Sequence, residues 1–192
     1  ALAPHLIEAH CSVRPIKRVF IWGRSFEKAE RFVENHGGVG DDFAACQDAR
    51  MAVAEADIVC TVTASPTPIL EGRWLRSGTH LNLVGAFTPE TREVDTEAIR
   101  RSRFFVEIRE FALREAGEVV IPIAEGAITA GHVAGEIGEV VAGIVTGRTR
   151  PDEVTAYKSL GNVAQDLSTA AFACEQAAKR PVPGVTRVAD FG

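Results

Sequence analysis

Short apolar runs alternate with amphipathic stretches along most of the chain. Residues 19–22 form one such run, Val-Phe-Ile-Trp, which ends at a glycine, and Phe26, Ala29 and Val33 then repeat on one face. A continuous apolar run closed by a tight turn is typical of a buried parallel strand. Apolar residues spaced three and four apart are typical of a helix. Residues 18–36 therefore predict a strand followed by a helix.

The same alternation continues downstream. The pattern predicts further strands over residues 43–46, 57–63, 79–85, 104–107 and 154–157. It predicts helices over residues 48–56, 95–101 and 131–147, a short helix around residues 74–75, and a glycine turn at residues 37–40. Strands that alternate with helices at this spacing indicate an α/β fold with a doubly wound, mostly parallel sheet of the Rossmann type.

The first ten residues already predict a helix, with Leu2, Leu6 and Ala9 on one face against a sheet. In a dinucleotide-binding domain, a helix at this point should follow a first strand and a glycine-rich loop. Neither precedes it here. We therefore expect the chain to be the carboxyl-terminal part of a longer protein. The chain itself would then form a Rossmann-like fold without its first strand and glycine loop.

A long helix is predicted from Gly161 onward. Its apolar residues step by four and three positions and form a narrow seam, made by Val163, Leu167, Ala170, Cys174 and Ala177. It should end before Pro181, with an extended tail. We expect residues 1–160 to form a partial nucleotide-binding domain and residues 161–192 a separate helix and tail.

Composition narrows the function classes. The chain has 192 residues and a net charge of −5, which argues against nucleic acid or an anionic membrane as its main partner. No apolar run reaches the length of a membrane span, and no signal peptide is visible. The four cysteines are widely spaced, without a Cys-x-x-Cys pair, so we expect reduced and partly buried thiols, no metal site and a cytoplasmic location.

The turn at residues 23–25 contains candidate cofactor ligands. Arg24 and Ser25 stand at the start of the predicted helix, with Lys28 one turn later. A cation and a hydroxyl at a helix N-terminus suit a phosphate, whereas an acid at this position would suit the ribose of NAD. The turn therefore favours NADP(H), with NAD(H) as the alternative. The other interpretation is that Ser25 only caps the helix and Arg24 is solvated.

Ligands of open α/β sheets bind at the carboxyl ends of the strands. This rule points to residues 23–25, 63–65, 85–87 and 158–161. Each turn also has a purely structural interpretation: Thr63 can simply end a strand, Gly85 can permit a bend, and Lys158 can be a solvated charge. Their shared position at strand ends is the reason for grouping them.

Several segments, in order, resemble the ornithine cyclodeaminase and mu-crystallin family. The matching segments are residues 18–25, 56–59, 61–65, 78–85, 92–95 and 155–161. The resemblance implies a homodimer with a Rossmann lobe that binds NAD(H) or NADP(H). It implies a second lobe that dimerises, holds a small amino or imino acid substrate, and takes up the last helix. The family's glycine loop and substrate-binding cations would precede residue 1.

The resemblance also implies roles for individual residues. Thr63 would touch the ribose region of the cofactor, and Arg24 and Ser25 would hold its 2′-phosphate. Val84 and Gly85 would border the nicotinamide.

The same resemblance places Ser159 at the nicotinamide carboxamide. It places Leu160 and Phe87 on the substrate side.

The chain departs from the family at one position. Ornithine cyclodeaminases and the related alanine dehydrogenase have Asp after Gly-Gly or Gly-Ala, where this chain reads Gly85-Ala86-Phe87. In the family, that Asp is the expected acid/base or water-orienting carboxylate, and a phenyl ring transfers no proton. Glu93 and Asp95 are close in sequence, but their motif favours a role in local structure. No catalytic residue is therefore assigned.

Three functions remain open. The first is an NAD(P)-dependent oxidoreductase that transfers hydride at the Cα–N bond of an amino acid or cyclic ketimine. The second is ornithine cyclodeaminase itself, with its base supplied from outside these residues. The third is a non-catalytic protein that binds cofactor or another ligand, as in mu-crystallin.

Overall fold

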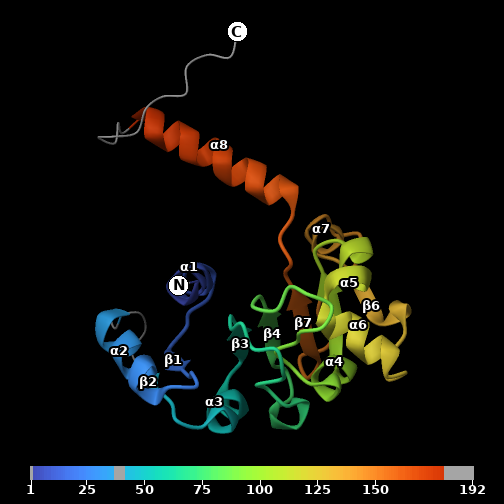
Figure 1. The fold of residues 1–192 in the computed structure, drawn as a ribbon, viewed down its shortest axis with the longest axis horizontal. Helices are drawn as coiled ribbons and strands as arrows, with labels where there is room; N and C mark the ends of the chain where they lie inside the picture. The colour runs from blue at the N-terminus through green and yellow to red at the C-terminus, as the bar shows by residue number, and fades with distance from the viewer. Residues whose placement is uncertain (1, 37–41, 180–192) are drawn as a thin grey trace. The chain divides into compact units, whose positions relative to one another are not determined.

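A computed structural model describes residues 2–36 and 42–179, in two units, residues 1–160 and 161–192 (Figure 1). The strands are β1 (Arg18–Ile21), β2 (Asp42–Ala45), β3 (Ile58–Thr61), β4 (His80–Leu83), β5 (Ser102–Val106), β6 (Val133–Glu136) and β7 (Val154–Lys158). The helices are α1 (Ala3–Val13), α2 (Phe26–His36), α3 (Ala49–Glu55), α4 (Thr96–Arg101), α5 (Arg109–Glu115), α6 (Gly117–Ala124), α7 (Ile137–Val141) and α8 (Val163–Lys179), with 3-10 turns η1 (Gly72–Trp74) and η2 (Ala130–His132).

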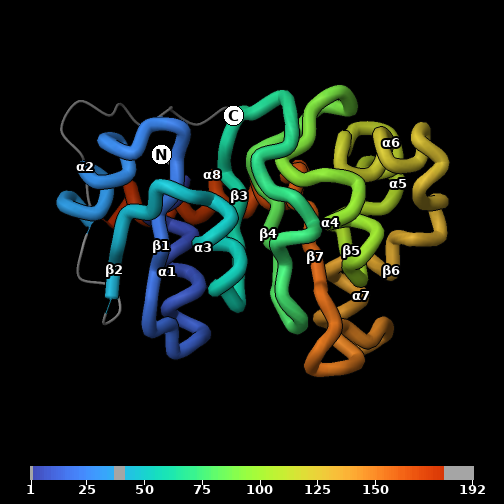
Figure 2. The backbone as a smooth tube through the Cα atoms, turned by 90° about the horizontal axis from the view of Figure 1, so that it is seen from below, coloured from blue at the N-terminus to red at the C-terminus, as the bar shows by residue number. Residues whose placement is uncertain are grey.

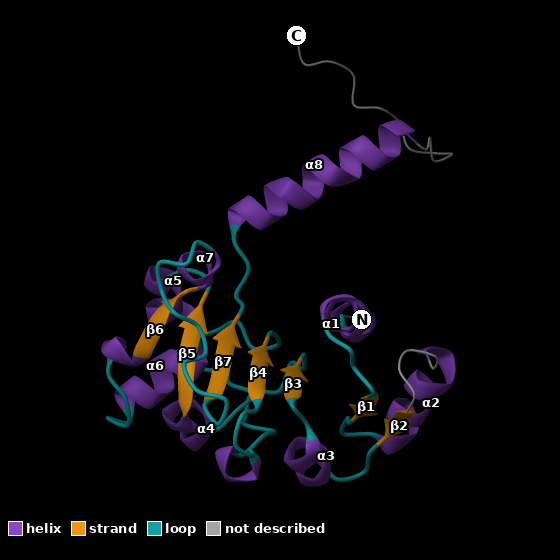
Figure 3. Cartoon of the chain, turned by 180° about the vertical axis from the view of Figure 1, so that it is seen from behind, coloured by secondary structure: helices purple, strands orange, loops and turns teal. Residues whose placement is uncertain are grey.

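The described strands form two parallel sheets (Figure 3). Five strands follow the order β3-β4-β7-β5-β6, and β1 pairs with β2. Strand β7 lies between β4 and β5, where Ala156 is opposite both Leu81 and Phe104. All of these ladders are parallel, which confirms the α/β class.

The core lies in the middle of the five-stranded sheet. Leu81, Leu83, Phe104 and Val106 are fully buried there, and Ile99 of α4 packs in the same cluster. A strand covered on both faces needs apolar side chains on both faces, which explains the continuous apolar run over residues 104–106 of β5. Strand β4 instead alternates buried leucines with the half-buried His80 and Asn82. Burying each large side chain contributes about 1.5–3 kcal/mol. This core fixes the strand ends at which the candidate site lies.

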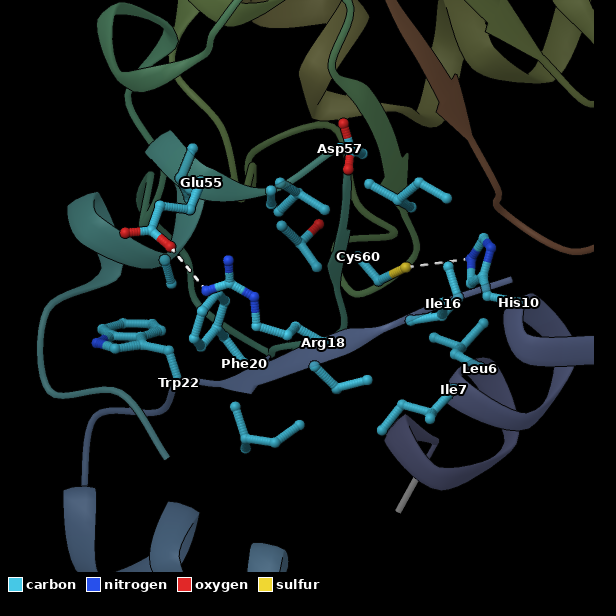
Figure 4. A pocket seen from close by; sticks show the side chains of 18 of the residues that line it. Leu6, Ile7, His10, Ile16, Arg18, Phe20, Trp22, Glu55, Asp57 and Cys60 are labelled. Carbon is cyan, nitrogen blue, oxygen red and sulfur yellow. Dashed lines mark hydrogen bonds and ion pairs between the residues drawn. The ribbon is translucent and has the colours of Figure 1, made fainter. Parts of the chain in front are cut away.

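A cavity of about 740 Å³ separates β1 from β3 (Figure 4). Both strands line it, together with Leu6, Ile7 and His10 of α1. Among the described strands, β1 pairs only with β2 and β3 only with β4, so each presents one unpaired edge. The predicted first helix exists, but none of its residues is fully buried. Of the three residues predicted to face a sheet, Leu6 is half-buried and lines the cavity, Ala9 is exposed, and Leu2, which precedes α1, is 56% exposed.

The sequence pattern was wrong over residues 131–147. Instead of one helix, this segment contains η2, β6 and α7, and Gly143 has a φ of 72° just after α7. Gly135 of β6 lies so close to Val145 that a Cβ would stand 2.9 Å from its Cγ1. The glycines thus let the chain fold back on itself rather than continue a helix.

Two short helices, α5 and α6, were not predicted. They have seven and eight residues, and α6 contains Pro122. Helices this short give little periodic signal, and an internal proline argues against one. They pack on each other, and α6 packs on α4.

The second unit contains α8, which begins at Val163 rather than Gly161. All five residues of the predicted apolar seam are exposed along it. The expected glycine turn at residues 37–40 and the extended tail beyond Pro181 lie outside the described residues.

Candidate functional site

Three neighbouring strands end in turns that contain predicted site residues. Thr63 follows β3, Val84 and Gly85 follow β4, and Ser159 follows β7. These strands are adjacent in the order β3-β4-β7, so their carboxyl ends lie along one edge (Figure 2). Val84 N donates to Thr61 O at 3.0 Å, which extends the β3–β4 pairing into the turns. The structure thus brings these predicted residues together.

Glu93 connects the turns after β3 and β4. Its carboxylate is fully buried and accepts from Thr61 Oγ1 at 2.7 Å, Thr63 N at 2.5 Å and Gly85 N at 2.8 Å. Three donors can compensate a buried carboxylate for the loss of water. Glu93 therefore has a structural position, as its motif indicated.

Gly85 leaves room for this arrangement. A Cβ at residue 85 would stand 2.1 Å from Thr63 O and 2.4 Å from Glu93 Oε1, closer than any real contact. The glycine is thus required by the close approach of two turns and a carboxylate, and not only by a bend.

A buried ion pair stabilises the carboxyl ends of β4 and β7. Lys158 Nζ lies 3.4 Å from Glu118 Oε2 and donates a hydrogen bond to Ala86 O. Burial raises the pKa of the Glu118 carboxyl, and the nearby Lys158 charge acts in the opposite direction. The interpretation of Lys158 as a solvated surface charge is therefore wrong, because its side chain is buried between β7 and α6.

Glu107, at the end of β5, holds the turn after β7. Its carboxylate accepts from Ser159 Oγ at 3.1 Å and from Leu160 N at 2.9 Å. Burial, and then the adjacent Glu107 charge, raise the pKa of Tyr157. The two residues predicted for the carboxamide and the substrate side are thus fixed by one carboxylate.

Phe87 is 68% exposed at the turn after β4. Asp95 is occupied elsewhere, since it accepts from Gly72 N and Ala98 N, both at 2.8 Å, and caps α4. Glu93 is enclosed by its three donors. Neither Glu93 nor Asp95 therefore provides the carboxylate that the family's Asp would provide at the position of Phe87.

The turn at residues 23–25 lies across the cavity from the other turns. Ser25 Oγ accepts from Lys28 N at 3.3 Å and so caps α2, and Arg24 is exposed. The capping role that the sequence allowed is present. It leaves the Arg24 guanidinium accessible at the end of β1.

Polar side chains also meet inside the cavity (Figure 4). His10 and Cys60 both line it, and His10 Nε2 lies 3.2 Å from Cys60 Sγ. His10 Nε2 also lies 3.5 Å from Nδ2 of Asn82 in β4. Burial raises the pKa of the Cys60 thiol to about 11, which disfavours the reactive thiolate. Cys11, Cys46 and Cys60 are partly buried, whereas Cys174 is exposed.

Residues 2–36 and 42–179 contain neither a metal-binding cluster nor a membrane-spanning helix. No group of three or more His, Cys, Asp or Glu side chains is placed to hold a metal ion. None of the helices in residues 2–36 and 42–179 combines the length and the apolar character that crossing a bilayer requires.

Sequence reasoning gave no supporting role to Glu107 or Glu118, and it named Lys158 at a strand end without recognising that its charge is buried. A charge directly after a buried apolar run was the available signal, since Glu107 follows residues 104–106 and Lys158 ends β7. Glu118 gave no such signal because α6 itself was not predicted.

The parallel sheets and the turns at their carboxyl ends define an α/β protein of the dinucleotide-binding class. A family model, the ornithine cyclodeaminase/mu-crystallin family, matches residues 1–180. The chain belongs to this family.

Relatives and solved structures agree on this placement. The chain is 38% identical over 172 residues to a Δ1-pyrroline-2-carboxylate reductase of Paracoccus denitrificans, covering 89% of the chain and 54% of the relative. It is 37% identical over 154 residues to the ketimine reductase mu-crystallin of Mus musculus, covering 80% of the chain and 45% of the relative. The chain thus spans about half the length of these relatives.

A solved structure of Thermococcus litoralis Δ1-pyrroline-2-carboxylate reductase, in complex with NADH and L-proline, is also similar. Its TM-score is 0.89 at 35% identity, and the match covers 94% of this chain and 56% of that one.

Proposed function

We propose that the protein is a nicotinamide-dependent reductase of cyclic ketimines that have a carboxylate on the imine carbon. The observation that supports this most directly is the row of three adjacent strand-end turns, after β3, β4 and β7, each fixed by buried charges. Relatives named as pyrroline-2-carboxylate and ketimine reductases support the same reaction class.

The residues present fit a nicotinamide cofactor. Gly85 has no side chain at the point where two turns approach closely, and Ser159 offers a hydroxyl at the next strand end. Thr63, Val84 and Gly85 would line the cofactor, and Ser159 would orient its carboxamide. When bound, the reduced nicotinamide supplies hydride for the imine carbon.

Phe87 favours an apolar ring as substrate. Its exposed phenyl group would form a wall of the substrate site, and Leu160 would also lie on the substrate side. A cyclic imine presents CH₂ groups to such a wall, whereas the ammonium of an ornithine side chain would lose hydration there. Because residue 87 transfers no proton, the proton for the imine nitrogen comes from water or from another group.

We infer that NADP(H) is the preferred cofactor. The turn after β1 presents the accessible Arg24 guanidinium and the Ser25 hydroxyl at the N-terminus of α2. This is the arrangement that suits a 2′-phosphate.

We further propose that one more parallel strand occupies the cavity between β1 and β3 in the full-length protein. The two unpaired edges there each need a partner for their backbone groups. Such a strand, entering α1 through a short loop, would join the two sheets and bring Arg24 into line with the other turns.

The test uses the full-length protein with NADPH or NADH and three substrates: Δ1-pyrroline-2-carboxylate, Δ1-piperideine-2-carboxylate and L-ornithine. We expect oxidation of the cofactor with formation of proline or pipecolate. If no ketimine is reduced, the proposal is wrong. Ammonia and proline formed from ornithine, without net cofactor oxidation, would identify a cyclodeaminase instead. Cofactor binding without either reaction would identify a binding protein.

A further inference from the structure

Glu93 belongs to none of the strands whose ends it connects. It lies in the segment between β4 and α4, and it reaches the ends of both β3 and β4. Two of its three donors, Thr63 and Gly85, are residues predicted to line the cofactor. One carboxylate therefore determines how far apart these two turns lie.

The charge of Glu93 is essential to this arrangement. Oε1 accepts from Thr63 N, and Oε2 accepts from Gly85 N as well as from Thr61 Oγ1. An amide in place of the carboxylate would put its NH₂ group against one backbone N–H in either orientation. A donor facing a donor leaves both unpaired, so the two turns would separate.

The backbone of Glu93 is also fixed by a hydrogen bond. Its backbone N–H donates to Glu118 Oε1 at 3.1 Å, and Glu118 pairs with Lys158. Lys158 in turn donates to Ala86 O, in the turn that begins with Gly85. The buried groups thus connect the turns after β3, β4 and β7 into one rigid frame.

We propose that Glu93 is a positioning residue for hydride transfer. This rests on the proposed function above. The Glu93 carboxylate accepts from Thr61 of β3 and from the turns after β3 and β4, which would border the nicotinamide. None of these three hydrogen bonds involves the turn of Arg24 at the end of β1. Losing the Glu93 charge should therefore displace the nicotinamide from the substrate and leave the rest of the cofactor bound.

The experiment compares Glu93→Gln with Glu97→Gln in the full-length protein. Glu97 is the matched control because it pairs with Arg100 on the outer side of α4. We measure the dissociation constant of NAD(P)H by fluorescence titration, the emission spectrum of the bound cofactor, and kcat and KM with pyrroline-2-carboxylate. For Glu93→Gln we expect kcat to fall about 10²-fold, the cost of misplacing reacting atoms by about 1 Å. The dissociation constant should change less than about threefold.

A second variant covers the case in which Glu93→Gln does not fold. Thr61→Val removes one of the three donors at nearly constant volume, and kcat should fall about tenfold. Wild-type kcat and wild-type cofactor emission in folded Glu93→Gln, or in folded Thr61→Val, would overturn the proposal. If the wild-type protein reduces no ketimine, the proposed function fails. The positioning role of Glu93 is then judged from the emission of bound NAD(P)H alone, and an emission spectrum of Glu93→Gln identical to that of the wild type would refute it.

Discussion

Lys158 Nζ lies 3.4 Å from Glu118 Oε2, and both side chains are completely inaccessible to solvent. Removing one partner of such a pair leaves a charge buried without compensation, which costs about 3–5 kcal/mol. We expect Lys158→Met to lower the free energy of unfolding by this amount, as measured by urea denaturation.

The double variant Lys158→Met/Glu118→Gln is the control for this prediction. It removes both charges, so it should be more stable than Lys158→Met alone. Equal stabilities of the single and double variants would contradict the prediction, because they would mean that the unpaired Glu118 charge does not destabilise Lys158→Met.

Gly85→Ala should abolish activity. The added methyl group would overlap Thr63 O and Glu93 Oε1, and backbone atoms cannot move aside as a flexible side chain can. Gly138→Ala is the matched control, because a Cβ there meets nothing within 4 Å. Thermal unfolding and ketimine reduction of both variants check this prediction. A fully active Gly85→Ala protein would contradict the described packing of these turns.

Arg24→Ala tests the cofactor preference. The loss of a hydrogen bond to a charged group at an exposed site should raise KM for NADPH about tenfold, and KM for NADH should stay the same. Arg14→Ala, which removes an exposed guanidinium that donates to the Val13 carbonyl of its own segment, is the control. An unchanged NADPH-to-NADH ratio would rule out Arg24 as a 2′-phosphate ligand.

Much of the α/β unit could be predicted from sequence, because buried parallel strands leave uninterrupted apolar runs. The strand around Phe104 is an example, since residues 104–106 are all apolar and buried. The segment 131–147 could not be predicted, since its apolar spacing suits a helix and only tertiary contact, as between Gly135 and Val145, selects the strand and turn.

The candidate site, too, could be predicted only in part from the sequence. Turn residues such as Gly85 and Ser159 could be predicted from their place after apolar runs. The partners of their supports could not, although the motif of Glu93 did indicate a structural role, because Glu93 and Glu118 act across 30 and 25 positions of sequence, on Thr63 N and Glu93 N respectively. A single sequence contains no local pattern for contacts of this separation.

Stability should fall as the pH drops from about 6.5 to 4. Burial first, and then the charges of Arg148 and His10, lower the pKa of His80 from its usual 6.5 to about 4. In this window the folded protein keeps His80 neutral, whereas the unfolded chain takes up a proton, and so unfolding is favoured. Urea denaturation between pH 7 and pH 4 measures the slope. His80→Gln should reduce it, and the exposed His36→Gln should not.

The apolar seam of α8 should form a subunit contact. Leu167 and Val163 are 69% and 80% exposed, and apolar residues repeating by three and four positions are typical of a helix that packs on a partner. We expect the full-length protein to be a homodimer by sedimentation. Leu167→Asp would bury a charge in that contact and should shift the protein toward monomer, whereas Thr169→Asp, which lies off the seam, should leave the dimer intact. A Leu167→Asp protein that remains fully dimeric would show that dimerisation does not use this seam.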